Sequence, residues 1–491
     1  MTELLNTLID SIGPGMMPST AYDTAWVARL DELEPTLSNH AIDWIVSHQL
    51  PDGSWGAAAP FNYYDRVIST LAAIIALTYR GRGMLHGKSI ELGRKALENI
   101  VSHTAKSFQA DPNSATIGFE MIIPTLMAEA EKLGIIRRQG ESILKQLSQL
   151  RKQKLSKIRG SLINRNTSMA FSAEMAGIDG KHMLDIENLQ ESNGSVGHSP
   201  SATAYFSLYV NQQDKQAREY LSKTVKKDGG APNVASFDAF EISWTLWNLH
   251  LIPGFKTTPR IKSLLDVLAN AWQPNRGIGF ATEYSVKDSD MTSLVFDTLL
   301  QYGYEKDVES ILGYEEQDHF RCYPLEADPS ISANIHVLGA LRRAGFKKDH
   351  PSIQKILRFL KQKKGTNSFW ADKWQLSPYY TTSHAIIACA GYADELVKDS
   401  VNWILSTQHP NGAWGTYLPT AEETAYAIQA LWVWNQNSSK IQADIIKKGT
   451  EWLEENSDGQ YPPLWIGKCL YSPNLVIRSA VVSALSLGKQ I

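Results

Sequence analysis

A thirteen-residue pattern occurs twice in the chain, once near each end. The copy WIVSHQLPDGSWG begins at Trp44 and the copy WILSTQHPNGAWG begins at Trp403, an offset of 359 positions. The Trp, Gln, Pro and Gly positions match in a single register. The Gln amide can bond the end of the following helix while the second Trp stacks over it, so the motif predicts a structural staple. Its duplication predicts two related helical domains.

Helical periodicity dominates the rest of the sequence, and no convincing strand alternation is present. The second half repeats a unit of small hydroxyl residue, apolar helix and often glycine. Copies of it begin at residues 292, 332, 382, 424 and 478. Helix pairs that recur every ~40–50 residues are typical of α/α solenoids, which can close into toroids. We predict an all-α fold with two α/α-barrel domains.

The turn-rich segment 226–238 (KKDGGAPNVASFD) is the best candidate for the junction between these domains. We therefore expect an N-terminal segment, residues 1–30, that packs with the second domain. Residues 31–235 would form the first α/α barrel. Residues 236–491 would form the second.

Charge and composition exclude several classes of partner. The net charge is −3, from 48 basic and 51 acidic side chains, which gives no electrostatic reason to expect nucleic acid or an anionic membrane. The longest apolar run, TLAAIIALTY, is about half the length that spans a bilayer, so no stable membrane insertion is expected. Three separated cysteines and the lack of a signal peptide predict a cytoplasmic protein without disulfides. The oligomeric state stays open, with a homodimer among the alternatives.

Common cofactor motifs are missing from the sequence. It contains no P-loop, GxGxxG, HExxH or CxxC pattern. It lacks the D-x-C of the zinc set in protein prenyltransferases, which also use α/α barrels. No two aspartates are adjacent, so an aspartate-rich site that ionises a diphosphate through metal ions is absent.

The stretch DSDM places Asp288 and Asp290 at the start of a predicted helix. One interpretation is a helix cap that complements the helix dipole. The other is acid catalysis, because two crowded carboxyl groups in an apolar site cannot both ionise and one then keeps its proton. Such an acid can protonate an alkene, and the neighbouring ionised carboxylate would orient it. Trp- and Tyr-rich helices would supply walls that stabilise a cation.

Several further motifs resemble those of one enzyme family, the class II diterpene cyclases, in order and over essentially the whole chain. The duplicated pattern looks like the QW motif of terpene cyclases. The C-terminal patterns DKW…YYTTSH, TAEETAY and PLWIGKCLYS resemble the bacterial halimadienyl and kolavenyl diphosphate synthases in particular. The other matching segments are 19–30, 116–130, 193–206, 229–244 and 276–293.

This resemblance implies a double α-barrel with its active site between the barrels and geranylgeranyl diphosphate as substrate. Asp288 matches the first aspartate of the family's DxDD motif, and Asp290 matches the middle one, the proton donor. Met291 stands in place of the last aspartate. Asn233 matches the Asn of a His–Asn pair that removes the final proton with water, whereas no His occurs in the matching segment 171–177. We therefore expect methyl and hydride shifts before deprotonation, giving a rearranged halimadane or clerodane skeleton.

The same resemblance suggests residues for the diphosphate end of the substrate. Glu120 resembles a metal-associated acid and would help to bind Mg²⁺, the expected cofactor. Lys373, Lys468, Trp374 and Tyr380 are the candidate substrate and diphosphate ligands. Structural roles are expected instead for Asp23, for the Asp65–Arg66 pair, and for His198 and His384, which we expect to cap or pack helices.

Three alternatives stay open from the sequence. A copalyl-type diphosphate synthase would use the same acid motif without rearrangement. A triterpene cyclase shares the QW motif, although this chain is short for that class and has few copies. A non-catalytic α/α-toroid binding protein would use DSDM only as a cap.

Overall fold

The computed structural model describes residues 2–13, 15, 17–80, 83–104, 114–136, 141–156, 162–324, 326 and 328–490. Its regular elements are helices apart from one small hairpin, β1 (Trp465–Ile466) and β2 (Leu470–Tyr471). The all-α prediction is confirmed. No helix within the described ranges combines the length and the apolar character that crossing a bilayer needs.

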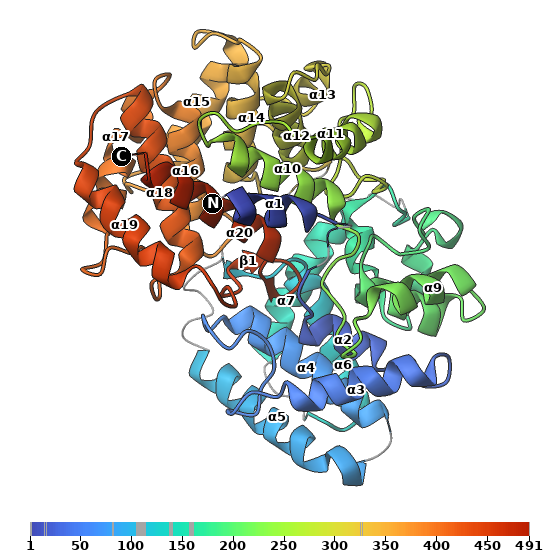
Figure 1. Ribbon diagram of the computed structural model, residues 1–491. Helices are drawn as coiled ribbons and strands as arrows, with labels where there is room; N and C mark the ends of the chain where they lie inside the picture. The colour runs from blue at the N-terminus through green and yellow to red at the C-terminus, as the bar shows by residue number, and fades with distance from the viewer. Residues whose placement is uncertain are drawn as a thin grey trace.

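Six helices of the second unit form a closed inner ring, in which each contacts the next and the last contacts the first (Figure 1). They are rich in Ala, Ser and Thr and almost entirely buried, because both faces pack on neighbours. In order they are α10 (Asp238–His250), α12 (Ser289–Gln301), α14 (Ile331–Arg343), α16 (Pro378–Cys389), α18 (Ala421–Asn437) and α20 (Asn474–Gly488).

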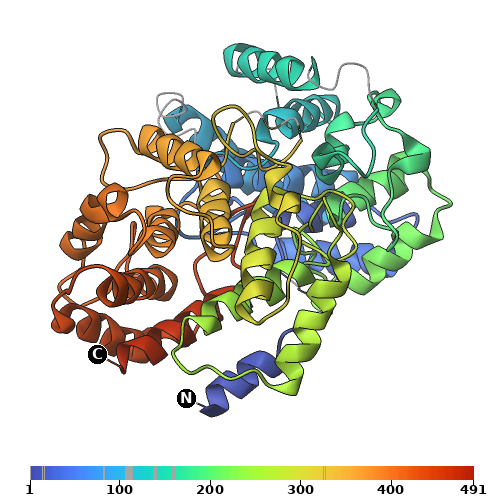
Figure 2. The same cartoon turned by 90° about the horizontal axis from the view of Figure 1, so that it is seen from above.

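An outer layer of amphipathic helices surrounds this ring and keeps its charged side chains outward. Helix α1 (Thr2–Asp10) completes the layer, since it contacts both α11 and α20. The two chain ends consequently lie on the same side of the molecule (Figure 2). The other outer helices are α11 (Pro259–Ala271), α13 (Glu309–Leu312), α15 (Pro351–Lys364), α17 (Asp394–Ser406) and α19 (Ala443–Asn456).

The first unit is built on a smaller ring, whose members again contact one another in a closed circle. A 3₁₀ segment takes the place of one helix. The ring consists of α2 (Ala21–Val27), α4 (Tyr63–Tyr79), α6 (Phe119–Lys132), η2 (Ser168–Ala176) and α8 (Pro200–Tyr205). Around it lie α3 (Pro35–Ser47), α5 (Gly83–Thr104), α7 (Glu141–Ser156), α9 (Lys215–Thr224) and the short turns η3 (Lys181–Met183), η4 (Ile186–Asn188) and η5 (Phe206–Val210).

The expected N-terminal segment 1–30 is divided between the two units. Leu8, Ile9 and Ile12 belong to the core of the second unit. The buried apolar residues of segment 21–30, by contrast, lie in the core of the first unit. Every residue of α2 is buried, which requires the helix to be surrounded by the rest of that unit. Beyond this N-terminal segment, the core residues up to Ala231 belong to the first unit, and those from Val234 onward, except Cys469, belong to the second. The boundary between the units therefore lies inside the turn-rich segment 226–238.

Both copies of the duplicated motif make the same local contacts. In the second copy Gln408 Nε2 donates to the carbonyl oxygens of Gly412 and Ile445, at 2.8 and 2.9 Å. The indole of Trp414 donates to the Ile404 carbonyl at 2.7 Å. The equivalent residues of the first copy are Gln49, Gly53, Ser89, Trp55 and Ile45. The motif ties one helix end to the next, as its sequence predicts.

The β1–β2 hairpin crosses from one unit to the other. Trp465 packs in the core of the second unit, and Cys469 packs in the core of the first. The Ile117 amide donates to the Gly467 carbonyl at 2.8 Å, and the Leu470 amide donates to the Asp65 carboxylate at 2.9 Å. The hairpin therefore holds the two units together, and it does so beside an apolar cavity that lies between them.

Candidate active site

Asp288 is the N-cap of α12, one of the inner-ring helices. Its Oδ1 accepts the Met291 amide at 2.7 Å, which is the cap that the sequence predicts. The side chain is 1 % exposed, and Oδ2 has no hydrogen-bond partner among the described residues. Burial, followed by the charge of Asp290, raises the pKa of Asp288 well above its usual value. Burial therefore favours the protonated form of Asp288 over its carboxylate.

Asp290 lies in the first turn of the same helix and has a different partner. Its Oδ1 is 2.5 Å from Nδ1 of His336, which α14 supplies. Its side chain remains 18 % exposed, toward the cavity that it lines. The two carboxyl groups form no hydrogen bond with each other. The expected orientation of Asp290 by an ionised Asp288 is therefore wrong: capping occupies Asp288, and an imidazole holds Asp290.

Both aspartates line an apolar cavity of about 150 Å³ between the two units. Met291 also lines it, so an apolar side chain faces the cavity where the DxDD motif has its last aspartate. The described part of the lining contains no His, Lys, Arg or Glu. Aromatic side chains make up most of the wall: Phe171, Phe237, Phe240, Phe280, Tyr284, Tyr323, Trp374, Tyr380, Trp465 and Tyr471.

A second cavity of about 280 Å³, named the polar cavity for the charged side chains in its lining, adjoins the first and shares Ile117, Ser168, Tyr323 and Trp374 with it. Two acid–base pairs line this polar cavity. Glu120 pairs with Lys154, and Glu326 pairs with Lys373. The structure thus places the predicted residues Glu120, Lys373 and Trp374 together, and it adds Lys154 and Glu326. Tyr380 lies on the apolar side of Trp374, toward the acid.

The polar cavity fits Mg²⁺ only together with a ligand that brings its own oxygen atoms. No cluster of three or more His, Cys, Asp or Glu side chains occurs in the described part of the chain. Mg²⁺ usually takes one or two carboxylates and completes its shell with water and substrate phosphates. Glu120 can supply one such carboxylate.

Lys468 does not reach either cavity, and its expected contact with a diphosphate is wrong. Its ammonium group is fully buried, and it donates to Glu174, Ser199 and Ser201, each at 2.7 Å. These three bonds use all the donors of the ammonium group. Lys468 instead joins the hairpin to the first unit.

Asn233 lines the apolar cavity, and its amide orientation is fixed. Nδ2 donates to Asp23 at 3.0 Å. Oδ1 lies against Gly467, where an added Cβ would approach it to 2.2 Å, so only glycine fits at that position. No His of the described lining accompanies Asn233, in agreement with the sequence of segment 171–177.

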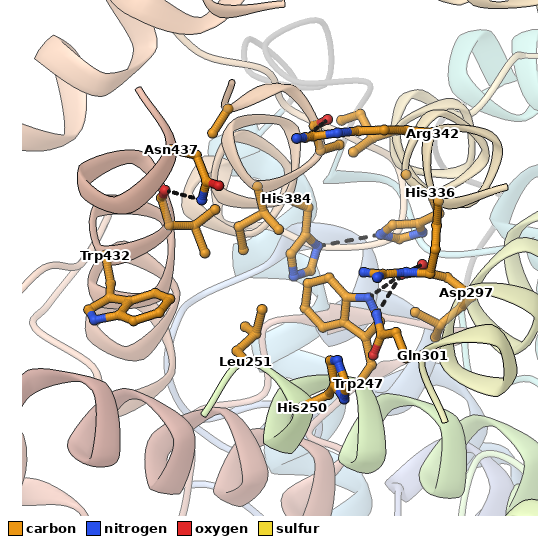
Figure 3. A pocket seen from close by; sticks show the side chains of 18 residues that line it. Trp247, His250, Leu251, Asp297, Gln301, His336, Arg342, His384, Trp432 and Asn437 are labelled. Atoms are coloured by element: carbon orange, nitrogen blue, oxygen red, sulfur yellow. Dashed lines mark hydrogen bonds and ion pairs between the residues drawn. The ribbon is translucent and has the colours of Figure 1, made fainter. Parts of the chain in front are cut away.

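A third cavity, the rear cavity, has a volume of about 380 Å³ and is lined by His336 (Figure 3), the residue that bonds Asp290. His336 bonds Asp290 with one nitrogen, and its Nε2 is 3.5 Å from Nδ1 of His384. Both imidazoles line this rear cavity. Three lining residues carry a buried polar atom without a partner in the described structure: Gln301 Oε1, His384 Nε2 and Trp432 Nε1. Such atoms fit ordered water.

The residues expected to be structural are buried, but Asp65 and Arg66 do not pair with each other. Asp23 bonds Ser201 and Asn233. Asp65 accepts from the Ala57 and Leu470 amides, and Arg66 pairs with Asp52 instead. His198 is enclosed by Phe280 and Tyr284, and burial lowers its pKa to about 4. His384 stacks on Trp244 at 5.1 Å, within α16 rather than at its start. The three cysteines are buried and free, as expected.

His336 is the site residue that the motifs missed. A signal for it exists in the spacing, because Asp290, His336 and His384 follow one another at intervals of 46 and 48 residues. These intervals match the helix-pair repeat, so they place the three side chains on consecutive inner helices.

Comparison with known proteins gives consistent matches. Residues 324–467 match the squalene-hopene cyclase C-terminal domain family. The type B diterpene cyclase of Mycobacterium tuberculosis is 46 % identical over 97 % of both chains. The (−)-kolavenyl diphosphate synthase of Salvia divinorum is 32 % identical over 76 % of this chain and 47 % of its own length. The ent-copalyl diphosphate synthase from Streptomyces platensis superposes with a TM-score of 0.79, at 26 % identity and 99 and 98 % coverage.

Proposed function

Because the chain belongs to the class II diterpene cyclase family, we propose that it protonates and cyclises geranylgeranyl diphosphate and keeps the diphosphate on the product. The observation that carries this proposal is the separation of chemistry along the site. An acid lines an aromatic cavity, and paired lysines and glutamates line the cavity that adjoins it.

The substrate would lie with its distal alkene at Asp290 and its diphosphate at Lys154 and Lys373. Each lysine would exchange a glutamate partner for phosphate oxygens, which bind ammonium groups strongly. Trp374, shared by both cavities, marks the point where the polyprenyl chain enters the apolar part. The aromatic faces stabilise the carbocation without reacting with it.

Asp290 donates the proton that starts cyclisation. In the competent state His336 donates its Nδ1 proton to Oδ1 of Asp290, and the acidic proton is on Oδ2, toward the cavity. The proton moves to the terminal alkene carbon and leaves a carboxylate beside the imidazole. Asp288 caps α12 and so holds the start of this helix, which carries Asp290, in place.

The acid must recover its proton after each turnover. The bound polyprenyl chain excludes water from the front of Asp290, whereas the rear cavity reaches His336 from behind. His336 takes a proton at Nε2 from water in the rear cavity, and the imidazolium passes its Nδ1 proton to the Asp290 carboxylate. Return of the imidazole to its Nδ1–H tautomer, with the acidic proton on Oδ2, restores the competent state. The proton that the product cation loses at the end balances this uptake.

Glu120 is the carboxylate that would hold Mg²⁺ together with the substrate diphosphate. The ion would neutralise the diphosphate charge and so help to retain the group on the product. Lys154 and Lys373 orient the same group from the protein side.

The product would be a rearranged bicycle of the halimadane or clerodane type. Asn233 has no imidazole partner in the described cavity, so no strong base meets the first bicyclic cation. Methyl and hydride shifts can then precede proton loss. A copalyl product would show that Asn233 with water suffices as the base.

The experiment is incubation of the purified protein with geranylgeranyl diphosphate and Mg²⁺, followed by dephosphorylation and identification of the diterpene alcohol. Asp290→Asn should reduce turnover by at least about 10²-fold, the range of general acid catalysis. Asp288→Asn is the matched control, because Asn also caps helices well, and it should reduce turnover less. Absence of any diterpenyl product would refute the function, and an active Asp290→Asn variant would refute the acid assignment.

A further inference from the structure

A second carboxyl group is buried directly behind the aromatic wall and has no part in the mechanism above. Glu422, in the first turn of α18, is 0 % exposed. Its Oε1 accepts three hydrogen bonds, from the indole of Trp465 at 2.7 Å, from the Gln375 amide at 3.1 Å and from the Tyr426 hydroxyl at 3.1 Å. Three donors on one oxygen fix the carboxyl group and everything bonded to it.

One of these donors, Trp465, belongs to the wall of the apolar cavity, and a second, Gln375, is next in sequence to the wall residue Trp374. Trp465 faces the cavity and is packed edge-on against Phe240 and Tyr380, at 5.6 and 4.9 Å between ring centres. Gln375 follows Trp374 in a short segment that pairs with the hairpin, since the Ile466 amide donates to the Trp374 carbonyl at 2.9 Å. Glu422 therefore holds the wall both through Trp465 itself and through the segment beside it.

We propose that Glu422 is a positioning and specificity-determining residue, which sets the plane and the electron density of the Trp465 ring that faces the bicyclic carbocation. This inference rests on the proposed cyclase function. A carboxyl group that accepts the indole N–H makes the ring face a better partner for a cation, and it does so more strongly when ionised. A longer-lived cation undergoes more methyl and hydride shifts before it loses a proton.

The charge of Glu422 changes in an accessible pH range. Burial, and next the charge of Glu423, raise the pKa of Glu422 to about 8. The other titratable groups that face it are tyrosines, from α18, α16, β2 and the loop before β1: Tyr426, Tyr380, Tyr471 and Tyr461. The pKa of each of them is raised, so they stay neutral while Glu422 ionises.

The ionisation of Glu422 determines in which direction pH changes the product ratio. Below about pH 8 Glu422 is neutral, and above it the carboxylate lies behind Trp465. The fraction of rearranged product should therefore rise with pH. The product ratio is set after the protonation step and is therefore insensitive to the rate of that step.

Folding stability gives an independent check of the same ionisation. The folded protein keeps the Glu422 proton up to about pH 8, whereas the unfolded chain loses it near the ordinary carboxyl value of 4.5. The stabilisation is therefore complete at low pH and is lost as the pH rises through this window. Glu422→Gln should lack this fall.

Glu423→Gln is a matched control for Glu422→Gln. Glu423 is the adjacent buried acid, but it accepts hydrogen bonds from Ser377, Thr416 and Thr420 and none from the cavity wall. It tests loss of a buried carboxylate without loss of the Trp465 contact.

The experiment measures the ratio of rearranged to unrearranged diterpenyl product from geranylgeranyl diphosphate between about pH 6 and about pH 9.5. The wild type should show a rise of about fivefold centred near pH 8, as a modest change in cation–π strength gives. Glu423→Gln should show a rise of similar size centred at a lower pH, because the Glu423 charge that raises the pKa of Glu422 is gone. Glu422→Gln should show a low, flat ratio. A pH-dependent ratio in folded Glu422→Gln would overturn the inference, as would a flat ratio in the wild type.

Trp465→Phe is used if Glu422→Gln does not fold, because it keeps a smaller aromatic ring at this position and removes the indole N–H donor. It should flatten the pH dependence, and retention of the rise would contradict the proposal. Failure of the wild type to convert geranylgeranyl diphosphate would refute both proposals. Normal turnover with an unchanged ratio in the variants would refute this one alone.

Discussion

At the scale of residues, the site depends on one carboxyl–imidazole contact. Asp290 faces the cavity, His336 holds it from behind, and His336 also borders the rear cavity. Asp288, two positions earlier, has the same side chain but a different environment and caps the helix. The geometry around each aspartate, rather than its identity, gives it its role.

His336→Asn should lower kcat by about 10²-fold and leave KM nearly unchanged, because the imidazole supports the acid and its reprotonation but does not bind the substrate. Steady-state kinetics with geranylgeranyl diphosphate measures this. His250→Asn is the control, since His250 lines the same rear cavity without a bond to Asp290. Equal kcat values for the two variants would contradict the role of His336.

The sequence identified Asp288 and Asp290 because an acid pair at a helix start is a local pattern. His336 and Glu326 could not be found in that way, since their contacts join positions 46 and 47 residues from their partners. Lys468 was misassigned for a related reason. Its buried partner Glu174 is 294 residues away in the sequence. No local pattern therefore distinguishes this buried, paired lysine from an exposed one.

At the scale of elements, the second tryptophan of each duplicated motif packs against a glycine in a neighbouring helix. Gly449 lies in α19, where an added Cβ would be 2.6 Å from the Trp414 ring. Gly93 in α5 is the counterpart for Trp55, at 2.7 Å. The contact requires glycine although glycine weakens a helix, so packing outweighs helix propensity here.

Gly449→Ala should therefore destabilise the protein by about 1–3 kcal/mol, the usual cost of overpacking. Gly339→Ala in α14 is the control, because a Cβ there meets nothing within 4 Å. That substitution should stabilise by up to about 1 kcal/mol through helix propensity. Chemical denaturation measures both changes, and a stabilised Gly449→Ala variant would show that the tryptophan yields to the methyl group.

Helices were predictable from the sequence because periodicity and capping residues are local. Asp288 accepts the expected amide at a helix start, and Thr20, Ser199 and Thr420 cap their helices in the same way. The closure of the second unit by α1 was predictable only as a packing preference of the N-terminal segment, and the division of residues 1–30 was not. Which barrel a short apolar helix joins depends on space that the sequence does not record.

At the scale of the whole molecule, two helical units and one crossing hairpin create a cavity that neither unit has alone. The second unit supplies Asp290 and most of the aromatic wall, and the first supplies Ser168 and Phe171. The hairpin supplies Trp465 and Gly467 and ties both units together. The duplicated motif predicted two related units. Both units are needed here because the cavity is lined by residues of each.

The central claim is that cyclisation begins with a proton from the enzyme and leaves the diphosphate in place. Turnover of geranylgeranyl diphosphate in D₂O tests it most directly, with mass spectrometry of the intact product. The account predicts a cyclic diterpenyl diphosphate that carries one deuterium atom, formed by the wild type and not by Asp290→Asn. Release of inorganic diphosphate with an unlabelled hydrocarbon product would contradict it.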